Sequence, residues 1–260
     1  MKYYVVADVH GFYTELIDVL KRKGFFEDNS PHKLVVCGDL FDRGKEAVKL
    51  QDFILDLMAK DEVVLIRGNH EDLMVELIQE IDQGLIKALQ GTHHWSNGTV
   101  DTMLQLPGVT ADEVKKNPEK CVSKMVKTPF FKAMLPAMVD FFEIEHYIFT
   151  HGWIPCSTMR YPGGAIRYIK EDSWRVADEK TWRLARWYNG MEAARQGAIE
   201  PGKTIVCGHW HCSYGNAKIL GKGEEFGLFA DYSPYYNTGV IGLDTCTAIT
   251  RKINCLVIED

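Results

Sequence analysis

Five short segments of the sequence each combine a glycine with residues that could bind a metal ion or move a proton. They are DVHG at 8–11, GDLFDRG at 38–44, RGNHE at 67–71, HG at 151–152 and GHWH at 208–211. Aspartate, asparagine and histidine suit transition metals, and the glycines let the backbone turn tightly. A single such residue after a strand is usually a turn former or a cap, but five glycine-flanked segments together favour a metal site.

Spacing within two of these segments predicts pairs of ligands. Asp8 and His10 are two residues apart, and so are His209 and His211. Residues two apart in an extended chain point to the same side, so the members of each pair are expected to converge. His211 is expected to reach the ion held by Asp8 and His10.

The remaining segments supply three further candidate ligands. Asp39 has two carboxylate oxygens and could bridge two cations, Asn69 offers a neutral amide oxygen, and His151 adds a nitrogen. This mixed set suits two divalent or trivalent transition-metal ions such as Mn, Fe or Zn better than Ca or Mg. Because only Asp8 and Asp39 are charged ligands, the site keeps a surplus of about two positive charges and favours an anionic substrate.

The elements that must position these residues follow from hydrophobic periodicity. Strands are predicted at 3–7, 33–37 and 62–66, separated by helices at 12–24 and 46–60. This alternation indicates parallel βαβ units, whose ligands collect at the carboxyl ends of the strands. Residues 71–140 are predicted to form a helical insertion or cap. Later strands, which indicate a second, mixed sheet, are predicted at 144–150, 203–207, 239–244 and 253–259.

Composition excludes several classes of protein. The chain has 260 residues, 46% of them hydrophobic, and a formal net charge of −6. A basic surface for nucleic acid is not expected, and no apolar run approaches the roughly 18 residues of a membrane span. We predict a cytoplasmic protein with one domain over 1–260, interrupted by the insertion at about 71–140. The sequence does not indicate an oligomeric state.

Taken in order, DxH, GDxxDRG, GNHE, HG and GHxH resemble the calcineurin-like metallophosphoesterase superfamily. The DRG and GNHE forms, and HHWSNGTVDTML after them, resemble the bacterial branch of Ser/Thr protein phosphatases and symmetrical dinucleoside tetraphosphate hydrolases. This resemblance implies an α/β fold, a four-layer α/β/β/α sandwich with a dimetal centre at its edge. It also implies in-line attack on phosphorus by a hydroxide that bridges the metals.

The resemblance also assigns catalytic roles. It implies that Asp42 orients His70, so that a protonated imidazole donates to the leaving alkoxide. Arg43, a rigid fork of donors, is expected to clamp phosphoryl oxygens, with an ion pair to Asp42 or Glu71 as the structural alternative. Glu71 itself is interpreted either as a residue of the helix start or as a group that supports the metal ligands from behind.

A second arginine is expected opposite the first. The segment TWRLARWYNG, at 181–190, resembles the family's arginine-bearing segment and places Arg186 in that role. Arg183 lies one helical turn away, and either arginine could instead be a solvated helix charge.

The substrate is left open between two classes. His211 belongs to the wider superfamily pattern and is usually lacking in the protein-phosphatase branch, while GHW is similar to the dinucleoside tetraphosphate hydrolases. The sequence predicts a phosphoesterase acting on phosphomonoesters, including phosphoserine or phosphothreonine in proteins. The alternative substrate is a dinucleoside polyphosphate.

Two other classes of protein are alternatives to an enzyme. A catalytically silent partner-binding scaffold would be favoured by the loss of a ligand, and no ligand of the pattern is lost. A structural zinc protein would favour cysteine-rich closed sites, whereas these candidates are aspartate, asparagine and histidine.

Overall fold

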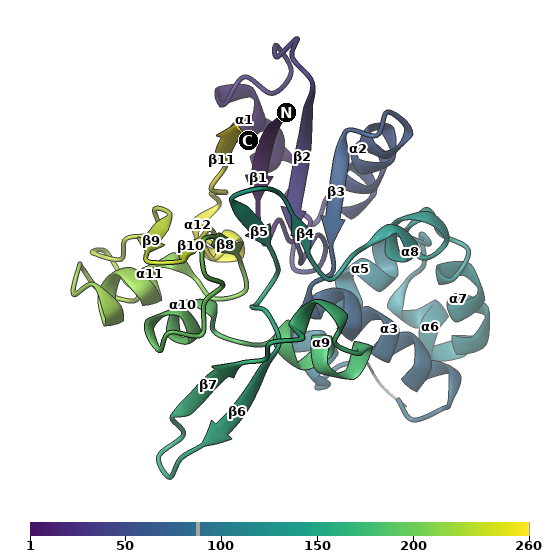
Figure 1. The fold of residues 1–260 in the computed structure, drawn as a ribbon. Helices are drawn as coiled ribbons and strands as arrows, with labels where there is room; N and C mark the ends of the chain where they lie inside the picture. The colour runs from purple at the N-terminus through teal and green to yellow at the C-terminus, as the bar shows by residue number, and fades with distance from the viewer. Residues whose placement is uncertain (87–88, 260) are drawn as a thin grey trace.

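The computed structural model describes residues 1–86 and 89–259, and its first sheet contains four strands (Figure 1). Their order is β11-β1-β2-β3, with bounds Leu256–Glu259, Lys2–Val6, His32–Cys37 and Val63–Ile66. Strands β1, β2 and β3 run parallel, and β11 pairs antiparallel with β1. The parallel βαβ units predicted for the first seventy residues are confirmed.

The second sheet has five strands in the order β4-β5-β8-β10-β9. Their bounds are Phe142–Glu143, Tyr147–Phe149, Thr204–Cys207, Val240–Gly242 and Tyr235–Asn237. β5, β8 and β10 are parallel, with antiparallel β4 and β9 at the edges, so this sheet is mixed as predicted. The strand predicted at 253–259 was assigned to the wrong sheet, because β11 closes the first one. Local periodicity identifies a strand but not its long-range partner.

Alternation of side chains along the strands explains how the two sheets pack. On β1, Tyr3 and Val5 face the second sheet, where they meet residues such as Phe149 and Val206. Tyr4 and Val6 point the other way, into a core shared with the helices of the first half of the chain. Each sheet is therefore buried on both faces, as parallel strands require.

Helices form the two outer layers, which completes the predicted α/β/β/α arrangement. α1 (Tyr13–Arg22) and α2 (Ala47–Ala59) cover the first sheet, while α3 (Asn69–Asp82), which follows β3, packs with the helices after it. α9 (Glu179–Ala185) and α10 (Gly190–Arg195) cover the second, where Trp182 and Met191 pack with Ile148 and Ile205. The shorter helices in this half are η2 (Trp174–Val176), α11 (Cys212–Tyr214), η3 (Gly215–Ile219) and α12 (Thr247–Thr250).

The part of the chain between β3 and β4 is helical. After α3 come α4 (His93–Ser96), α5 (Thr99–Gln105), α6 (Ala111–Lys116), α7 (Pro118–Met125), η1 (Phe130–Met134) and α8 (Leu135–Ala137). These helices gather beside the first sheet (Figure 1). The division of the chain into one domain with an insertion stays a prediction.

A hairpin that the sequence did not predict extends away from the sheets (Figure 1). It consists of β6 (Cys156–Arg160) and β7 (Ile166–Lys170), which pair antiparallel. Among the described residues, no helix is both long and apolar enough to cross a membrane.

Candidate metal centre

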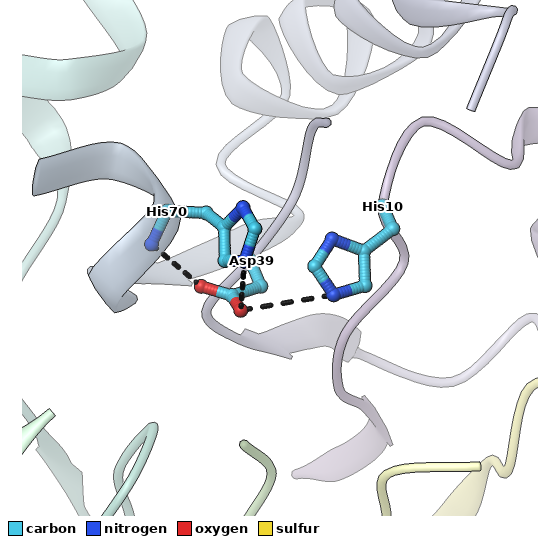
Figure 2. A group of neighbouring side chains, drawn as sticks. All are labelled: His10, Asp39 and His70. Carbon is cyan, nitrogen blue, oxygen red and sulfur yellow. Dashed lines mark hydrogen bonds and ion pairs between the residues drawn. The ribbon is translucent and has the colours of Figure 1, made fainter. Parts of the chain in front are cut away.

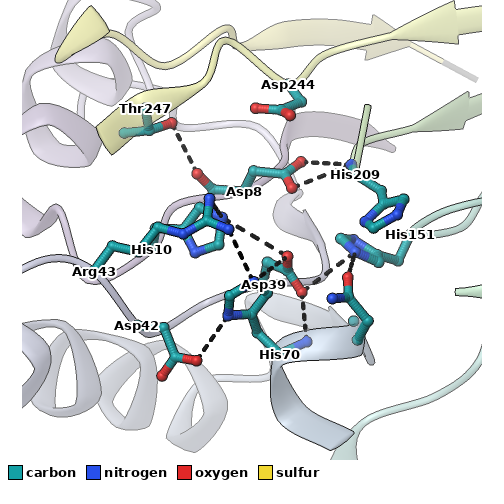
Figure 3. Close-up of polar contacts among 12 residues, drawn as sticks. Asp8, His10, Asp39, Asp42, Arg43, His70, His151, His209, Asp244 and Thr247 are labelled. Carbon is teal, nitrogen blue, oxygen red and sulfur yellow. Dashed lines mark hydrogen bonds and ion pairs between the residues drawn. The ribbon is translucent and has the colours of Figure 1, made fainter. Parts of the chain in front are cut away.

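The residues that follow the ends of five of the strands lie close together. Asp8 follows β1, Asp39 follows β2, Asn69 follows β3, His151 follows β5, and His209 follows β8. Figure 3 shows the side chains of Asp8, Asp39, His151 and His209 close together, and Asn69 Oδ1 lies 2.7 Å from His151 Nε2. The carboxyl ends of these strands therefore lie together and bring the candidate residues to one place.

The backbone at the site is unusual. Nine described non-glycine residues have a positive φ, and six of these lie in the motif segments. The six are Asp8 (52°), His10 (52°), Asp39 (51°), Asp42 (76°), Arg43 (63°) and His209 (65°). Left-handed backbone is unfavourable for residues with a Cβ atom and tends to concentrate at functional sites. The turns aim polar side chains inward at the cost of local backbone energy.

Asp39 lies at the middle of the site, as Figure 2 shows. Its Oδ1 accepts from the backbone N–H of His70 at 3.0 Å and lies 3.3 Å from His151 Nε2. Its Oδ2 lies 3.7 Å from His10 Nε2 and 3.8 Å from His70 Nε2. Burial opposes ionisation, but the surrounding histidines outweigh it and hold the pKa of Asp39 below its usual value.

Two groups of possible ligand atoms share Asp39. One contains His10, Asp39 and His70, and the other contains Asp39, His151 and His209. Within each group the ligand atoms lie within 4.8 Å of one another. A carboxylate common to both groups is the arrangement expected of a bridge between two ions.

The donor set around His151 fits a cation. Its Nδ1 lies 2.9 Å from the carbonyl oxygen of Cys37, which can only accept, so Nδ1 carries the proton. Burial lowers the pKa of His151 and favours the neutral ring, which has no second proton. The lone pair of Nε2 then faces Asn69 Oδ1 at 2.7 Å and the Asp39 carboxylate. Three electron-rich atoms that converge in this way are satisfied by a positive ion.

His10 and His209 are oriented by backbone carbonyls in the same manner. His10 Nδ1 lies 3.0 Å from the carbonyl oxygen of Phe41, which leaves Nε2 directed toward Asp39. A ring N–H of His209 donates to the carbonyl of Trp187. Burial lowers the pKa of both histidines, that of His209 to about 3. Such carbonyl partners set the tautomer of metal-binding histidines.

Asp8 contributes a second buried carboxylate on the side of His209 (Figure 3). Both of its oxygens accept from the backbone N–H of His209, at 3.1 and 3.0 Å. A Cβ atom at position 208 would overlap this carboxylate, so Gly208 permits the approach. Burial, followed by repulsion from Asp244 and Asp39, raises the pKa of Asp8, which is the situation a bound cation would relieve.

His70 differs from the other histidines because its partner is a carboxylate. Its Nδ1 donates to Asp42 Oδ2 at 2.7 Å, and the same oxygen accepts from the Thr99 hydroxyl at 2.8 Å. Burial lowers the pKa of His70, but attraction to Asp39 and the bond to Asp42 outweigh burial and raise it. A raised pKa suits a proton donor better than a metal ligand.

Arg43 lies exposed at the mouth of the site. Its Nη1 lies 3.1 Å from His10 Nε2, and its Nη2 lies 3.2 Å from His70 Nε2. Within residues 1–86 and 89–259, Arg43 makes no ion pair with Asp42 or Glu71, which was the structural alternative to a phosphate-binding role. When His70 is protonated, both His70 and Arg43 are donors, so an anionic oxygen would satisfy the two together.

Glu71 joins the ends of two strands. Its carboxylate accepts from the backbone N–H groups of Gly68 at 2.7 Å, Asp39 at 3.1 Å and Leu40 at 3.0 Å. Burial, followed by repulsion from Asp39, raises the pKa of Glu71 to about 7. The residue lies in the first turn of α3, in agreement with its interpretation as a helix-start residue.

Asp244 is a residue of the site that sequence reasoning missed. It is buried, accepts from the Cys246 N–H at 2.7 Å and lies close to Asp8 (Figure 3). Burial raises its pKa to about 6. Asp244 follows β10, so the reasoning applied to the other strand ends could have found it, although no glycine flanks it directly.

Arg186 does not occupy the position predicted for a second phosphate clamp. It is 2% exposed, and its guanidinium donates to Asp72 at 2.8 Å, Asp140 at 2.5 Å and Glu179 at 3.1 Å. Three carboxylates neutralise this arginine and join α3, α9 and the chain before β4. The alternative Arg183 is exposed and pairs with Glu76, as a solvated helix charge does.

His211 is also placed away from the candidate ligands. Its Nδ1 contacts Ser213 Oγ at 2.8 Å and accepts from the Tyr214 N–H, and its Nε2 lies 3.7 Å from Glu225. The prediction assumed an extended chain, but His209 has a left-handed φ of 65°, which turns the two side chains apart. His211 instead caps the short helix α11.

The sequence profile of the calcineurin-like phosphoesterases matches residues 1–213, and the chain belongs to this family. Over 76 residues it is 34% identical to the asymmetrical bis(5'-nucleosyl)-tetraphosphatase PrpE of Bacillus velezensis. The matched segment is 27% of this chain and 30% of that protein. Over 71 residues it is 35% identical to the symmetrical bis(5'-nucleosyl)-tetraphosphatase of Buchnera aphidicola, a match of 27% of this chain and 24% of that protein. The chain thus matches less than a third of the length of these relatives.

A solved structure shares the fold. The cold-active protein-tyrosine phosphatase of a Shewanella species superimposes with a TM-score of 0.51 over 100% of this chain and 75% of that one, at 17% identity. At this identity the similarity concerns the arrangement of the elements only.

Proposed function

We propose that the protein is a metal-dependent phosphoesterase. The observation that carries the proposal is the position of Asp39, a buried carboxylate with one oxygen toward His151 and the other toward His10. Membership of the calcineurin-like phosphoesterases supports the same reading.

The proposed ligands form two sets that share one carboxylate. They are Asp8, His10, Asp39, Asn69, His151 and His209. Two bound transition-metal ions, of which Mn, Fe and Zn are the candidates, would activate water as a nucleophile and offset the charge that builds on the phosphoryl group. Carbonyl partners keep the histidine ligands in the tautomer that leaves a lone pair facing Asp39.

His70 and Asp42 are proposed to protonate the leaving group. The bond of 2.7 Å between His70 Nδ1 and Asp42 holds the imidazole in place and stabilises its charged form. His70 Nε2 then carries the proton that is passed to the departing oxygen. The Thr99 hydroxyl, which donates to the same carboxylate oxygen, keeps Asp42 oriented.

Arg43 is proposed to bind the phosphoryl oxygens. Its two terminal nitrogens reach His10 and His70, so its fork spans the space beside Asp39 from the solvent side. Because Arg186 is bound by three carboxylates, no second arginine is proposed to act with it.

The substrate class is proposed in two versions. Phosphomonoesters, including phosphoserine and phosphothreonine in proteins, were the first expectation from the sequence. Dinucleoside polyphosphates are an equally supported alternative, because relatives that match about a quarter of the chain are named bis(5'-nucleosyl)-tetraphosphatases.

A substrate panel tests both versions. Metal-free protein would be reconstituted with Mn, Fe or Zn and assayed on p-nitrophenyl phosphate, phosphopeptides and diadenosine tetraphosphate. We expect metal-dependent release of product from at least one of them. Absence of turnover on the whole panel, with metal bound, would favour the partner-binding scaffold.

A further inference from the structure

Trp187 is exposed beside the candidate metal centre. Three of the tryptophans are core residues, since Trp153, Trp174 and Trp182 are at most 2% exposed. Trp187 is 46% exposed, yet its ring lies 5.6 Å from the ring of the proposed ligand His209, at an interplanar angle of 85°. An indole surface is therefore presented to solvent at the edge of the site.

The backbone holds Trp187 in this place. Helix α9 ends at Ala185, whose carbonyl accepts from the Trp153 N–H at 3.1 Å. A Cβ atom at Gly152 would lie 2.6 Å from the Arg186 carbonyl oxygen, so the HG turn packs directly against the end of this helix. The Trp187 carbonyl then accepts from the ring of His209. The backbone at residue 187 is therefore held beside both His151 and His209.

An aromatic ring half exposed at such a fixed position has lost much of the stabilisation that burial would give it. Stacking with a planar group of a ligand would recover that stabilisation. Such stacking tolerates any aromatic base, because every base has a π-face.

The indole lies beside the candidate metal ligands and is not one of them. The ligand atoms of Asp39 and His209 lie within 4.8 Å of each other, and the His209 ring lies 5.6 Å from the indole. A substrate with its phosphoryl group at Asp39 could stack a ring on Trp187 if a spacer joins the two groups. Ribose separates a nucleobase from its 5'-phosphate, whereas an aryl phosphate has no such spacer.

We propose that Trp187 is the stacking surface for the nucleobase of a nucleotide substrate. The inference rests on the proposed phosphoesterase function and narrows its substrate class to nucleoside phosphates or polyphosphates. Trp187 acts in substrate binding, with no part in the chemical step.

Kinetics on a matched pair of substrates provide the first test. Diadenosine tetraphosphate and inorganic tripolyphosphate share the P–O–P bond, but only the former carries a base. In Trp187→Leu we expect KM for diadenosine tetraphosphate to rise roughly 5- to 150-fold, with kcat within about twofold and tripolyphosphate unaffected. Trp187→Phe should restore most of the affinity. An equal change on both substrates, or on neither, would overturn the proposal.

A binding measurement separates this inference from the phosphoesterase proposal. Calorimetric titration of the metal-loaded protein with adenosine 5'-monophosphate and with ribose 5-phosphate needs no turnover. The wild type should bind the nucleotide more tightly, and Trp187→Leu should lose that preference. Equal binding of both compounds by the wild type would contradict the role of Trp187, whether or not the protein hydrolyses phosphoesters. If Trp187→Leu loses the preference for the nucleotide while the protein hydrolyses none of the substrates, the role of Trp187 in base binding stands and the phosphoesterase proposal is wrong.

The chain offers a matched control variant. Trp95 is 47% exposed but lines a surface cavity with Ile81 and Val114 in the helical segment. Trp95→Leu should keep the preference for the nucleotide. Metal content should be unchanged in Trp187→Leu, because His209 is held by the backbone carbonyl of residue 187, which the substitution retains.

Discussion

The two sides of Asp39 contain histidines with different partners and different protonation. His70 donates to the carboxylate of Asp42, and its pKa is raised. Across Asp39, His151 faces the carbonyl of Cys37 and His209 faces that of Trp187, and burial lowers the pKa of both. The hydrogen-bond partner of each histidine thus favours either donation of a proton, at His70, or binding of a cation, at His151 and His209.

The partner of the ring, more than its position, sets this difference. His10 lies on the same side as His70, with ring centroids 4.7 Å apart, yet it faces the carbonyl of Phe41 and its pKa is lowered. A carboxylate stabilises the imidazolium, whereas a neutral carbonyl only selects the tautomer. The comparison therefore predicts distinct failures when each residue is changed.

The largest effect is expected from Asp39→Asn, which weakens both sides at once. We expect kcat to fall on the order of 10³-fold, because metal-assisted charge stabilisation is lost. The measurement is phosphoester hydrolysis in excess Mn, with thermal unfolding to show that the chain stays folded. Asp61→Asn is the matched control, since Asp61 also has a left-handed φ but pairs with Lys33 at the surface. Normal turnover in Asp39→Asn would remove Asp39 from the centre of the site.

His151→Ala should disable one side selectively. We expect one equivalent of metal to be lost and kcat to fall about 10²-fold, while the ligands around His10 keep their ion. Metal analysis after dialysis against a weak chelator measures the stoichiometry. Retention of both equivalents would show that His151 is not a ligand.

On the opposite side, His70→Asn should keep both metals and slow the reaction according to the leaving group. Alkyl phosphates should lose roughly 10²-fold in kcat, and p-nitrophenyl phosphate much less, since its leaving group needs no proton. The check is a comparison of kcat across leaving groups. Equal losses on both substrates would take the proton-donor role from His70.

The two arginines should fail in different ways. Arg43→Ala should raise KM by about tenfold with the free energy of unfolding unchanged, because the side chain is exposed. Arg186→Ala should remove the partner of Asp140 and leave Asp72 and Glu179 with Arg67 alone, which should lower the free energy of unfolding by about 3 kcal/mol, with KM retained in the folded protein. Urea unfolding and steady-state kinetics on both variants test this. A rise in KM confined to Arg186→Ala would restore the clamp predicted from the sequence.

The smallest effect is expected from His211→Ala. Because its ring contacts Ser213 and Glu225, both metal affinities should stay within about twofold of the wild type. Metal titration of the variant gives the answer. A selective loss of one ion would return His211 to the ligands.

Much of this architecture can be predicted from the sequence, because strand ends in parallel sheets collect at one edge. That rule predicts that Asp39, Asn69 and His151 lie together, and it applies equally to Asp244. It did not place His211, because the turn at His209 is left-handed and period-two alternation does not hold there.

Other features depend on contacts between segments distant in sequence. Arg186 pairs with Asp72, Asp140 and Glu179, which are separated from it in sequence by 114, 46 and 7 positions. A local helix pattern therefore cannot distinguish an ion-pair network from a phosphate clamp. The assignment of β11 to the first sheet likewise depends on its pairing with β1. Local propensity alone determines neither the role of Arg186 nor the sheet to which β11 belongs.

Stoichiometric titration of the chelator-treated wild-type protein with Mn, with phosphoester hydrolysis followed at each addition, tests the central claim most directly. The account predicts two equivalents bound, with turnover developing as the second is added. Full activity in the presence of chelator, or saturation at a single equivalent, would contradict a two-metal centre built around Asp39.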